Sequence, residues 1–157
     1  TAPKRKAAYD EAYAQFIDPT SDVGRNIRGV LNQIPPRYKA RAIEQANELM
    51  QIDDVGVRSL TVDAQGNLTE YPNIIQLDYI KRGLGNIISE ATDPVTNKMS
   101  PEGANASKLY TRLSRAMTRA VPQYGEAVNL GLENIIEENA IRLVQHEKNA
   151  EDRDSAY

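Results

Sequence analysis

The chain has 157 residues, with 19 Lys and Arg against 22 Asp and Glu and a formal net charge of -3. This length suits a single domain with one hydrophobic core. Because the chain contains no Cys and only one His, disulfides, cysteine nucleophiles and Cys/His zinc clusters are excluded. Its apolar runs fall far short of the roughly 20 residues that span a bilayer, and no signal-peptide pattern opens it. We therefore expect neither a membrane span nor a secretion signal.

Apolar residues at intervals of three and four predict three helices in the first part of the chain. The first stops at Asp18-Pro19, because the residue before a proline disfavours helical backbone. Ser21 or Asp22 caps the second, which ends at Pro35-Pro36. The apolar stripe of the first helix is Ala8, Tyr9, Ala12, Tyr13, Phe16 and Ile17. The stripe of the third helix is Ala42, Ile43, Ala46, Leu49 and Met50.

The pattern changes to alternation over residues 58–71, where two short stretches flank a turn that contains Gly66. Alternation around a glycine turn is typical of paired strands. We expect one small β-hairpin here, the only strand signal in the chain.

Three longer helices are predicted after Pro72, the first with Gly83 and Gly85 in its interior. Glycine weakens a helix, so these two predict close packing against another backbone or a local bend. Ser100 caps the next helix, with Pro101 at its first position, and Pro122 opens a last helix that reaches Leu143. The fold class is mostly α: a single bundle-like domain of about six helices over residues 1–146, whose last three helices pack as antiparallel neighbours. Residues 147–157 form a charged tail, either a solvated helix end or disordered.

One helix carries a row of cations at intervals of four, three and four, beside Lys81 and Arg82 on the helix before it. We call this row the basic stripe; its members are Lys108, Arg112, Arg115 and Arg119. Such a row can neutralise phosphates. Glutamates on the last helix can instead pair with it as an ion-pair lattice, and those glutamates are Glu126, Glu133 and Glu137.

The chain has eight Tyr against one Phe and no Trp, and five of the tyrosines lie at or beside apolar stripes. A tyrosine ring can pack in a core while its hydroxyl finds a partner, and Tyr is also enriched at assembly interfaces. Both interpretations stay open for Tyr9, Tyr13, Tyr79, Tyr110 and Tyr124.

No constellation of catalytic, cofactor-binding or metal-binding residues emerges from the sequence. His146 lies near Glu133, Glu137 and Glu138, but the Glu-x-x-His pairs of a di-iron bundle are missing. The glycines at 83 and 85 lie inside a helix rather than after a strand, so they do not form a phosphate-binding loop. We expect no enzyme activity and no cofactor.

A series of short segments in a fixed order carries a family resemblance. Its best block is Gln76 to Leu84, and the other segments are Tyr9 to Tyr13, Ala46 to Met50, the turn at Gly66, Asp93-Pro94, Glu102-Gly103 and Pro122 to Gly125. In this order they resemble a helical domain found within large phage and prophage proteins of alphaproteobacteria. The resemblance implies a segment of an internal virion, ejection or tail-associated protein, without catalytic residues.

We therefore expect a non-enzymatic structural domain that contacts other virion or phage proteins, or copies of itself, through helical surfaces. The candidate contact residues are the basic stripe together with Tyr110. Two alternatives remain: a DNA-contacting helical module for genome packaging or ejection, and a passive spacer beside a catalytic domain in a longer parent chain. Because the chain opens on Thr1 rather than Met, we expect an excised fragment or a processed product, located in the virion or the host cytoplasm.

Overall fold

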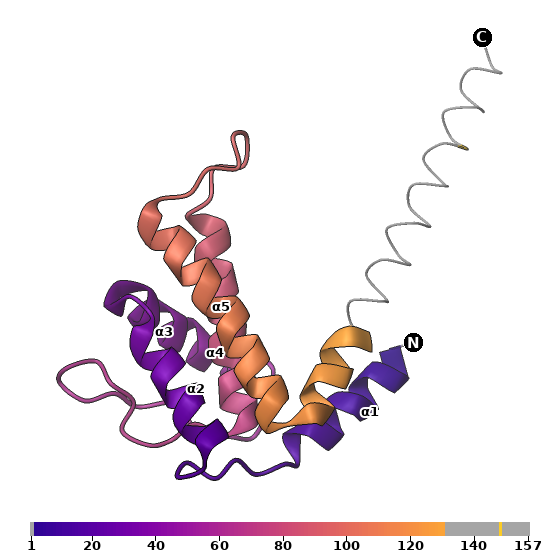
Figure 1. Cartoon of the computed structure of the whole chain (residues 1–157). Coiled ribbons are helices and arrows are strands. Elements are labelled where there is room, and N and C mark those ends of the chain that lie inside the picture. The colour runs from indigo at the N-terminus through magenta and orange to yellow at the C-terminus, as the bar shows by residue number, and fades with distance from the viewer. Residues whose placement is uncertain (1, 131–147, 149–157) are drawn as a thin grey trace.

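A computed structural model describes residues 2–130 and Lys148 (Figure 1). The named helices are α1 (Ala2–Tyr13), α2 (Asp22–Gln33), α3 (Pro36–Ile52), α4 (Ile74–Glu90) and α5 (Pro101–Ala120). A sixth helical segment occupies residues 122–130. The predicted mostly helical, bundle-like fold is confirmed. The expected continuation of the last helix through Leu143 and, apart from Lys148, the predicted tail 147–157 lie outside the described residues.

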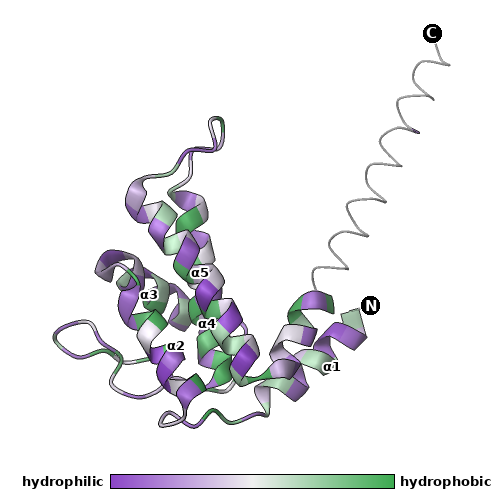
Figure 2. Cartoon of the chain, in the orientation of Figure 1, coloured by the Kyte–Doolittle hydropathy of each residue, from purple (hydrophilic) through white to green (hydrophobic). Residues whose placement is uncertain are grey.

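Helix α4 lies at the centre of the molecule, because it packs against both α3 and α5, while α2 packs against α5. It buries residues on most of its circumference, and Figure 2 shows apolar colour concentrated along it and between the helices. Helices α4 and α5 run antiparallel on either side of the loop 91–100 (Figure 1), as predicted for this pair. The described part of the third helix of that prediction, residues 122–130, lies beside α1 instead. The largest fully buried side chains are Tyr124, Ile27, Ile34, Ile74, Leu77, Ile80, Leu84, Ile87, Leu109, Leu113, Met117 and Val121.

Polar side chains fix the starts of three helices. Ser21 and Ser100 each accept a hydrogen bond from a backbone N–H three residues later, at 3.1 Å. This confirms the predicted cap at Ser100 and selects Ser21 over Asp22 as the cap of α2. Helix α4 begins with a capping box, in which Asn73 and Gln76 exchange two hydrogen bonds of 2.8 Å. These contacts satisfy amides that have no partner within the helix.

The two glycines of α4 lie where neighbouring elements approach closely, as the sequence predicts. A Cβ atom at Gly83 would come within 2.6 Å of the Ala42 carbonyl oxygen on α3. At Gly85 it would come within 3.2 Å of the Tyr110 ring on α5. The absence of a side chain at residue 83 therefore lets the backbones of α3 and α4 meet.

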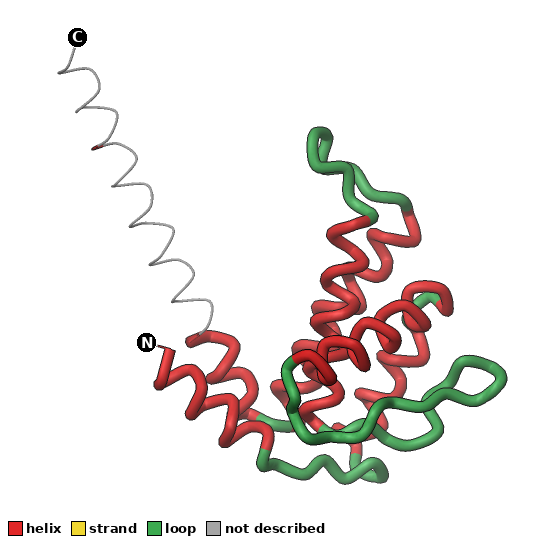
Figure 3. Tube along the Cα trace, turned by 180° about the vertical axis from the view of Figure 1, so that it is seen from behind, coloured by secondary structure: helices red, strands yellow, loops and turns green. Residues whose placement is uncertain are grey.

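The first helix is shorter than predicted. It ends at Tyr13, so the expectation that Phe16 and Ile17 continue its apolar stripe is wrong. Asp18 organises the next turn instead, because its side chain accepts hydrogen bonds from Thr20 and its carbonyl accepts one from the hydroxyl of Ser21. Residues 14–17, between α1 and Asp18, form a loop (Figure 3). This loop buries Ile17 and leaves Phe16 84% exposed.

The predicted β-hairpin at residues 58–71 is not seen. The described residues contain no strand, and this segment is a loop with one isolated antiparallel bridge between Val62 and Leu68 (Figure 3). The turn itself forms, since the amide of Asp63 donates to the Asn67 carbonyl at 2.9 Å. The amide of Thr69 also donates to the Thr61 carbonyl, at 3.0 Å. Pairing extends no further because the backbone N–H and C=O of Leu60 bind the side-chain amide of Asn47 on α3, at 2.7 and 3.0 Å.

Helix α1 and residues 122–130 lie side by side at one end of the molecule (Figures 1 and 3). The rings of Tyr9 and Tyr124 meet edge to face, with their centres 6.3 Å apart. Ala12 is the only buried residue of α1, so this helix is attached along a narrow strip. Within the part of the chain that the structure describes, no helix is both long and apolar enough to cross a membrane.

Candidate functional site

The four residues of the basic stripe, Lys108, Arg112, Arg115 and Arg119, are all exposed on α5. The opposite face of the same helix buries Leu109, Leu113 and Met117 against the core, so the cations project from a helix fixed in place. Arg119 lies in the last turn, where a positive charge is favourable at the helix C-terminus. The structure therefore presents the stripe as one outward-facing charged surface.

Little within the described residues neutralises this surface. No described carboxylate lies within salt-bridge distance of the stripe, and Glu126, one of the predicted partners, takes part in no described ion pair. The other predicted partners, Glu133 and Glu137, lie outside the described residues. Arg112 donates a hydrogen bond of 3.3 Å to the side chain of Gln33 on α2, a neutral partner that leaves its charge uncompensated.

Lys81 does not join this surface, contrary to the expectation that it lies beside the stripe together with Arg82. Lys81 is only 7% exposed, and its ammonium lies 4.7 Å from the ring centre of Tyr124 and 5.7 Å from that of Tyr110. Such cation–π contacts compensate in part for lost hydration. The Tyr110 ring is half-buried between Lys81 and Gly85, so part of this candidate contact residue packs inside the molecule.

A buried carboxylate joins three parts of the chain, which sequence reasoning did not single out. Asp78 of α4 is 2% exposed and accepts hydrogen bonds from Tyr13 of α1 at 2.5 Å and from Tyr124 at 2.6 Å. Arg82 lies one turn later and places a guanidinium nitrogen 2.9 Å from the same carboxylate. We call these four residues the Asp78 centre. Together they satisfy a charge that would be costly to bury alone.

The Asp78 centre continues toward α3 through Arg82. The Arg82 guanidinium lies 4.6 Å from the ring centre of Tyr79 and 3.9 Å from the carboxylate of Asp53. The hydroxyl of Tyr79 donates to Asp53 at 2.5 Å. One arginine thus bridges the buried and the exposed carboxylate.

The tyrosines of this network are held in their protonated form. Burial raises the pKa of Tyr13 and of Tyr124 well above the usual range, and the negative charge of Asp78 raises both further. Burial and the hydrogen bond to Asp53 raise the pKa of Tyr79 to about 12. Burial lowers the pKa of Lys81, while Asp78 opposes that change. Each phenol is therefore a hydrogen-bond donor at neutral pH.

This geometry suits a structural role rather than acid–base chemistry. A general acid or base must reach the substrate, whereas both oxygens of Asp78 are engaged and the residue is almost completely enclosed. The sequence contains a pattern that indicates a buried charge at Asp78. Asp78 and Lys81 fall in the helical register of the apolar Leu77 and Leu84, and charges inside an apolar stripe of a tyrosine-rich chain point to a buried polar network.

Among residues 2–130 and Lys148, no group of three or more His, Asp and Glu side chains could hold a metal ion. His146 and its neighbouring glutamates at 133, 137 and 138 lie outside these residues. Comparison with known proteins finds no matching family model, no matching curated protein and no matching solved structure. The resemblance to phage and prophage proteins gains no support from these comparisons.

Proposed function

We propose that this chain is a non-enzymatic interaction domain that binds an acidic protein surface through the basic stripe of α5. The observation that carries the proposal is the exposed row of four cations, with no described carboxylate in salt-bridge distance. A fixed helix presents these charges at a set spacing, and a complementary row of carboxylates would match them. Charge complementarity of this kind speeds association and selects the partner.

A protein partner fits the surroundings of the stripe better than DNA does. The whole chain has a net charge of -3, which disfavours approach to a polyanion. Tyr110, the aromatic residue of α5 nearest the stripe in sequence, packs against Lys81 and Gly85, which leaves less of its ring for base stacking. The virion or prophage setting belongs to the proposal as well, and its support is the sequence resemblance alone.

The test measures binding of a fluorescently labelled helical peptide that carries Glu at the intervals of the stripe. We expect salt-sensitive binding, lost in the double variant Arg112→Glu/Arg115→Glu. The matched control is Arg25→Glu/Arg58→Glu, which makes the same charge change at exposed arginines of α2 and of the loop before α4. The control should retain most of the binding.

Duplex DNA of arbitrary sequence is tested under the same conditions. Tighter binding to DNA, with a steep loss on adding salt and the same dependence on Arg112 and Arg115, would replace the proposal with the DNA-contacting alternative. Binding to neither probe at low salt would leave the passive-spacer alternative. Light scattering across a concentration series identifies self-association, which we expect to weaken with salt if the stripe of one copy binds carboxylates of another.

A further inference from the structure

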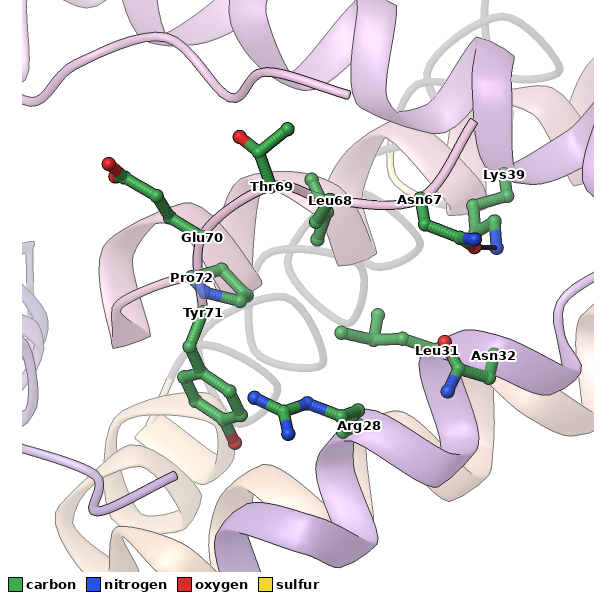
Figure 4. A pocket seen from close by; sticks show the side chains of 10 residues that line it. All are labelled: Arg28, Leu31, Asn32, Lys39, Asn67, Leu68, Thr69, Glu70, Tyr71 and Pro72. Atoms are coloured by element: carbon green, nitrogen blue, oxygen red, sulfur yellow. Dashed lines mark hydrogen bonds between the residues drawn. The ribbon is translucent and has the colours of Figure 1, made fainter. Parts of the chain in front are cut away.

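A pocket of about 380 Å³ lies between α2 and the loop that precedes α4 (Figure 4). Helix α2 contributes Arg28, Leu31 and Asn32, α3 contributes Lys39, and the loop contributes residues 67–72. Its volume falls within the roughly 300–1,000 Å³ typical of ligand pockets. None of these residues belongs to the basic stripe or to the Asp78 centre.

Two cations in the lining have no carboxylate partner among the described residues. The guanidinium carbon of Arg28 lies 5.3 Å from the ring centre of Tyr71. The Tyr71 hydroxyl donates to the Gly24 carbonyl at 2.8 Å. This hydrogen bond fixes the position of the ring, and the ring in turn positions the guanidinium of Arg28. Lys39 donates to the Asn67 side-chain oxygen at 3.2 Å. Both cations are thus positioned by neutral groups.

The only acid in the lining is turned away from these cations. Glu70 pairs with Arg58 at 3.1 Å, and Figure 4 shows its carboxylate directed away from Arg28 and Lys39. The pocket consequently has a positive character that no group in its own lining cancels. A bound anion would supply the missing charge.

The space between the two cations is apolar. Figure 4 shows Leu31 and Leu68 projecting into it from opposite sides. Asn32 is an exposed residue of the lining beside Leu31 (Figure 4), and its carboxamide can both donate to and accept from a peptide group. The lining therefore presents two cations, with leucine side chains between them and an amide beside Leu31.

We propose that this pocket binds a short peptide segment of a partner protein in which two acidic side chains flank an apolar one. The carboxylates bind Arg28 and Lys39, the apolar side chain rests on Leu31 and Leu68, and the peptide backbone pairs with Asn32. A free dicarboxylate would satisfy the cations but would leave the amide and the leucines unused. This inference goes beyond the proposed function, because it uses a different surface.

The experiment titrates the full chain with the labelled, end-capped tripeptide Glu-Leu-Glu and follows fluorescence anisotropy, with amide chemical shifts in NMR to locate the site. We expect shifts confined to residues 28–39 and 67–72. Arg28→Gln and Lys39→Gln should each weaken binding about tenfold, as loss of one charge-assisted hydrogen bond does. Asn32→Ala should weaken it less.

Three comparisons make the test specific. Arg25→Gln removes an exposed charge from the same helix outside the pocket and should leave the affinity unchanged, as should Arg112→Gln in the basic stripe. The double variant Arg28→Glu/Lys39→Glu should prefer the tripeptide Lys-Leu-Lys. Equal weakening by Arg25→Gln and Arg28→Gln, no shift in the lining, or glutarate binding as tightly as the tripeptide would each overturn the proposal.

Discussion

We expect replacement of Asp78 to lower the free energy of unfolding more than any other change proposed here, because three donors converge on its buried carboxylate. Asp78→Ala leaves Arg82 and two phenols without their partner, and we expect it to lower the free energy of unfolding by about 3–5 kcal/mol. Tyr124→Phe removes one hydrogen bond and should cost about 1–2 kcal/mol. Urea unfolding followed by circular dichroism measures both.

The matched control for Tyr124→Phe is Tyr38→Phe, the same chemical change at a buried tyrosine of α3. The Tyr38 ring is 7% exposed, and its hydroxyl makes no hydrogen bond to a described residue. We expect a change within about 0.5 kcal/mol. Equal effects at residues 38 and 124 would show that the hydrogen bond to Asp78 contributes nothing.

The raised tyrosine pKa values predict a loss of stability in alkali. Unfolded tyrosines release their protons near pH 10, whereas Tyr13, Tyr79 and Tyr124 hold theirs to higher pH in the folded chain. Above about pH 10 the unfolded state therefore binds fewer protons, and the free energy of unfolding falls as the pH rises. Below about pH 10 the three tyrosines contribute their full share of the free energy of unfolding. Urea unfolding at a series of alkaline pH values measures the slope.

Two comparisons separate the tyrosines from other groups. Tyr124→Phe should make the alkaline decline shallower. Lys81 acts in the opposite sense, because its lowered pKa makes the folded chain release that proton first, so Lys81→Met should make the decline steeper. A folded chain whose tyrosine absorbance titrates together with that of the urea-unfolded chain would contradict this account.

At the scale of the helices, the contact between α3 and α4 depends on a missing side chain. Gly83→Ala would place a methyl group 2.6 Å from the Ala42 carbonyl oxygen, so we expect a loss of about 1–3 kcal/mol despite the better helix propensity of alanine. Gly29→Ala in α2 meets nothing within 4 Å and should stabilise by about 0.5–1 kcal/mol. Thermal unfolding of the two variants should therefore shift in opposite directions.

Helix periodicity predicted α2, α3, α4 and α5 because each of them buries a stripe at intervals of three and four. Helix periodicity failed where side-chain hydrogen bonds to the backbone decide the local structure. The end of α1 depends on the turn at Asp18, and the hairpin is lost because Asn47 takes the backbone groups of Leu60. The basic stripe was predicted because exposure follows from local spacing. The Asp78 centre was missed because its two tyrosines lie 65 and 46 residues from the carboxylate along the chain.

At the scale of the whole molecule, the packing predicts uneven protection. Helix α1 buries only Ala12, whereas α4 buries residues on most of its circumference. We expect the amides of α1 to exchange with solvent faster than those of α4, because local opening exposes little apolar surface there. Tyr13→Phe should accelerate exchange in α1 and leave α3 and α4 unchanged. Hydrogen exchange followed by mass spectrometry measures the exchange rates of α1 and α4 separately. Equal protection of the two helices would contradict the prediction.

The Asp78 centre also sets an order of events during synthesis. Tyr13 leaves the ribosome 65 residues before the carboxylate that receives its hydroxyl, and Tyr124 follows that carboxylate by 46 residues. Helix α1 therefore lacks its hydrogen-bond partner on α4 until residue 78 has been synthesised. When Tyr124 emerges, the carboxylate receives its last donor and the earliest and latest described helices are joined in one step. Residues 122–130 thus add the last contact to the end of the molecule where α1 lies.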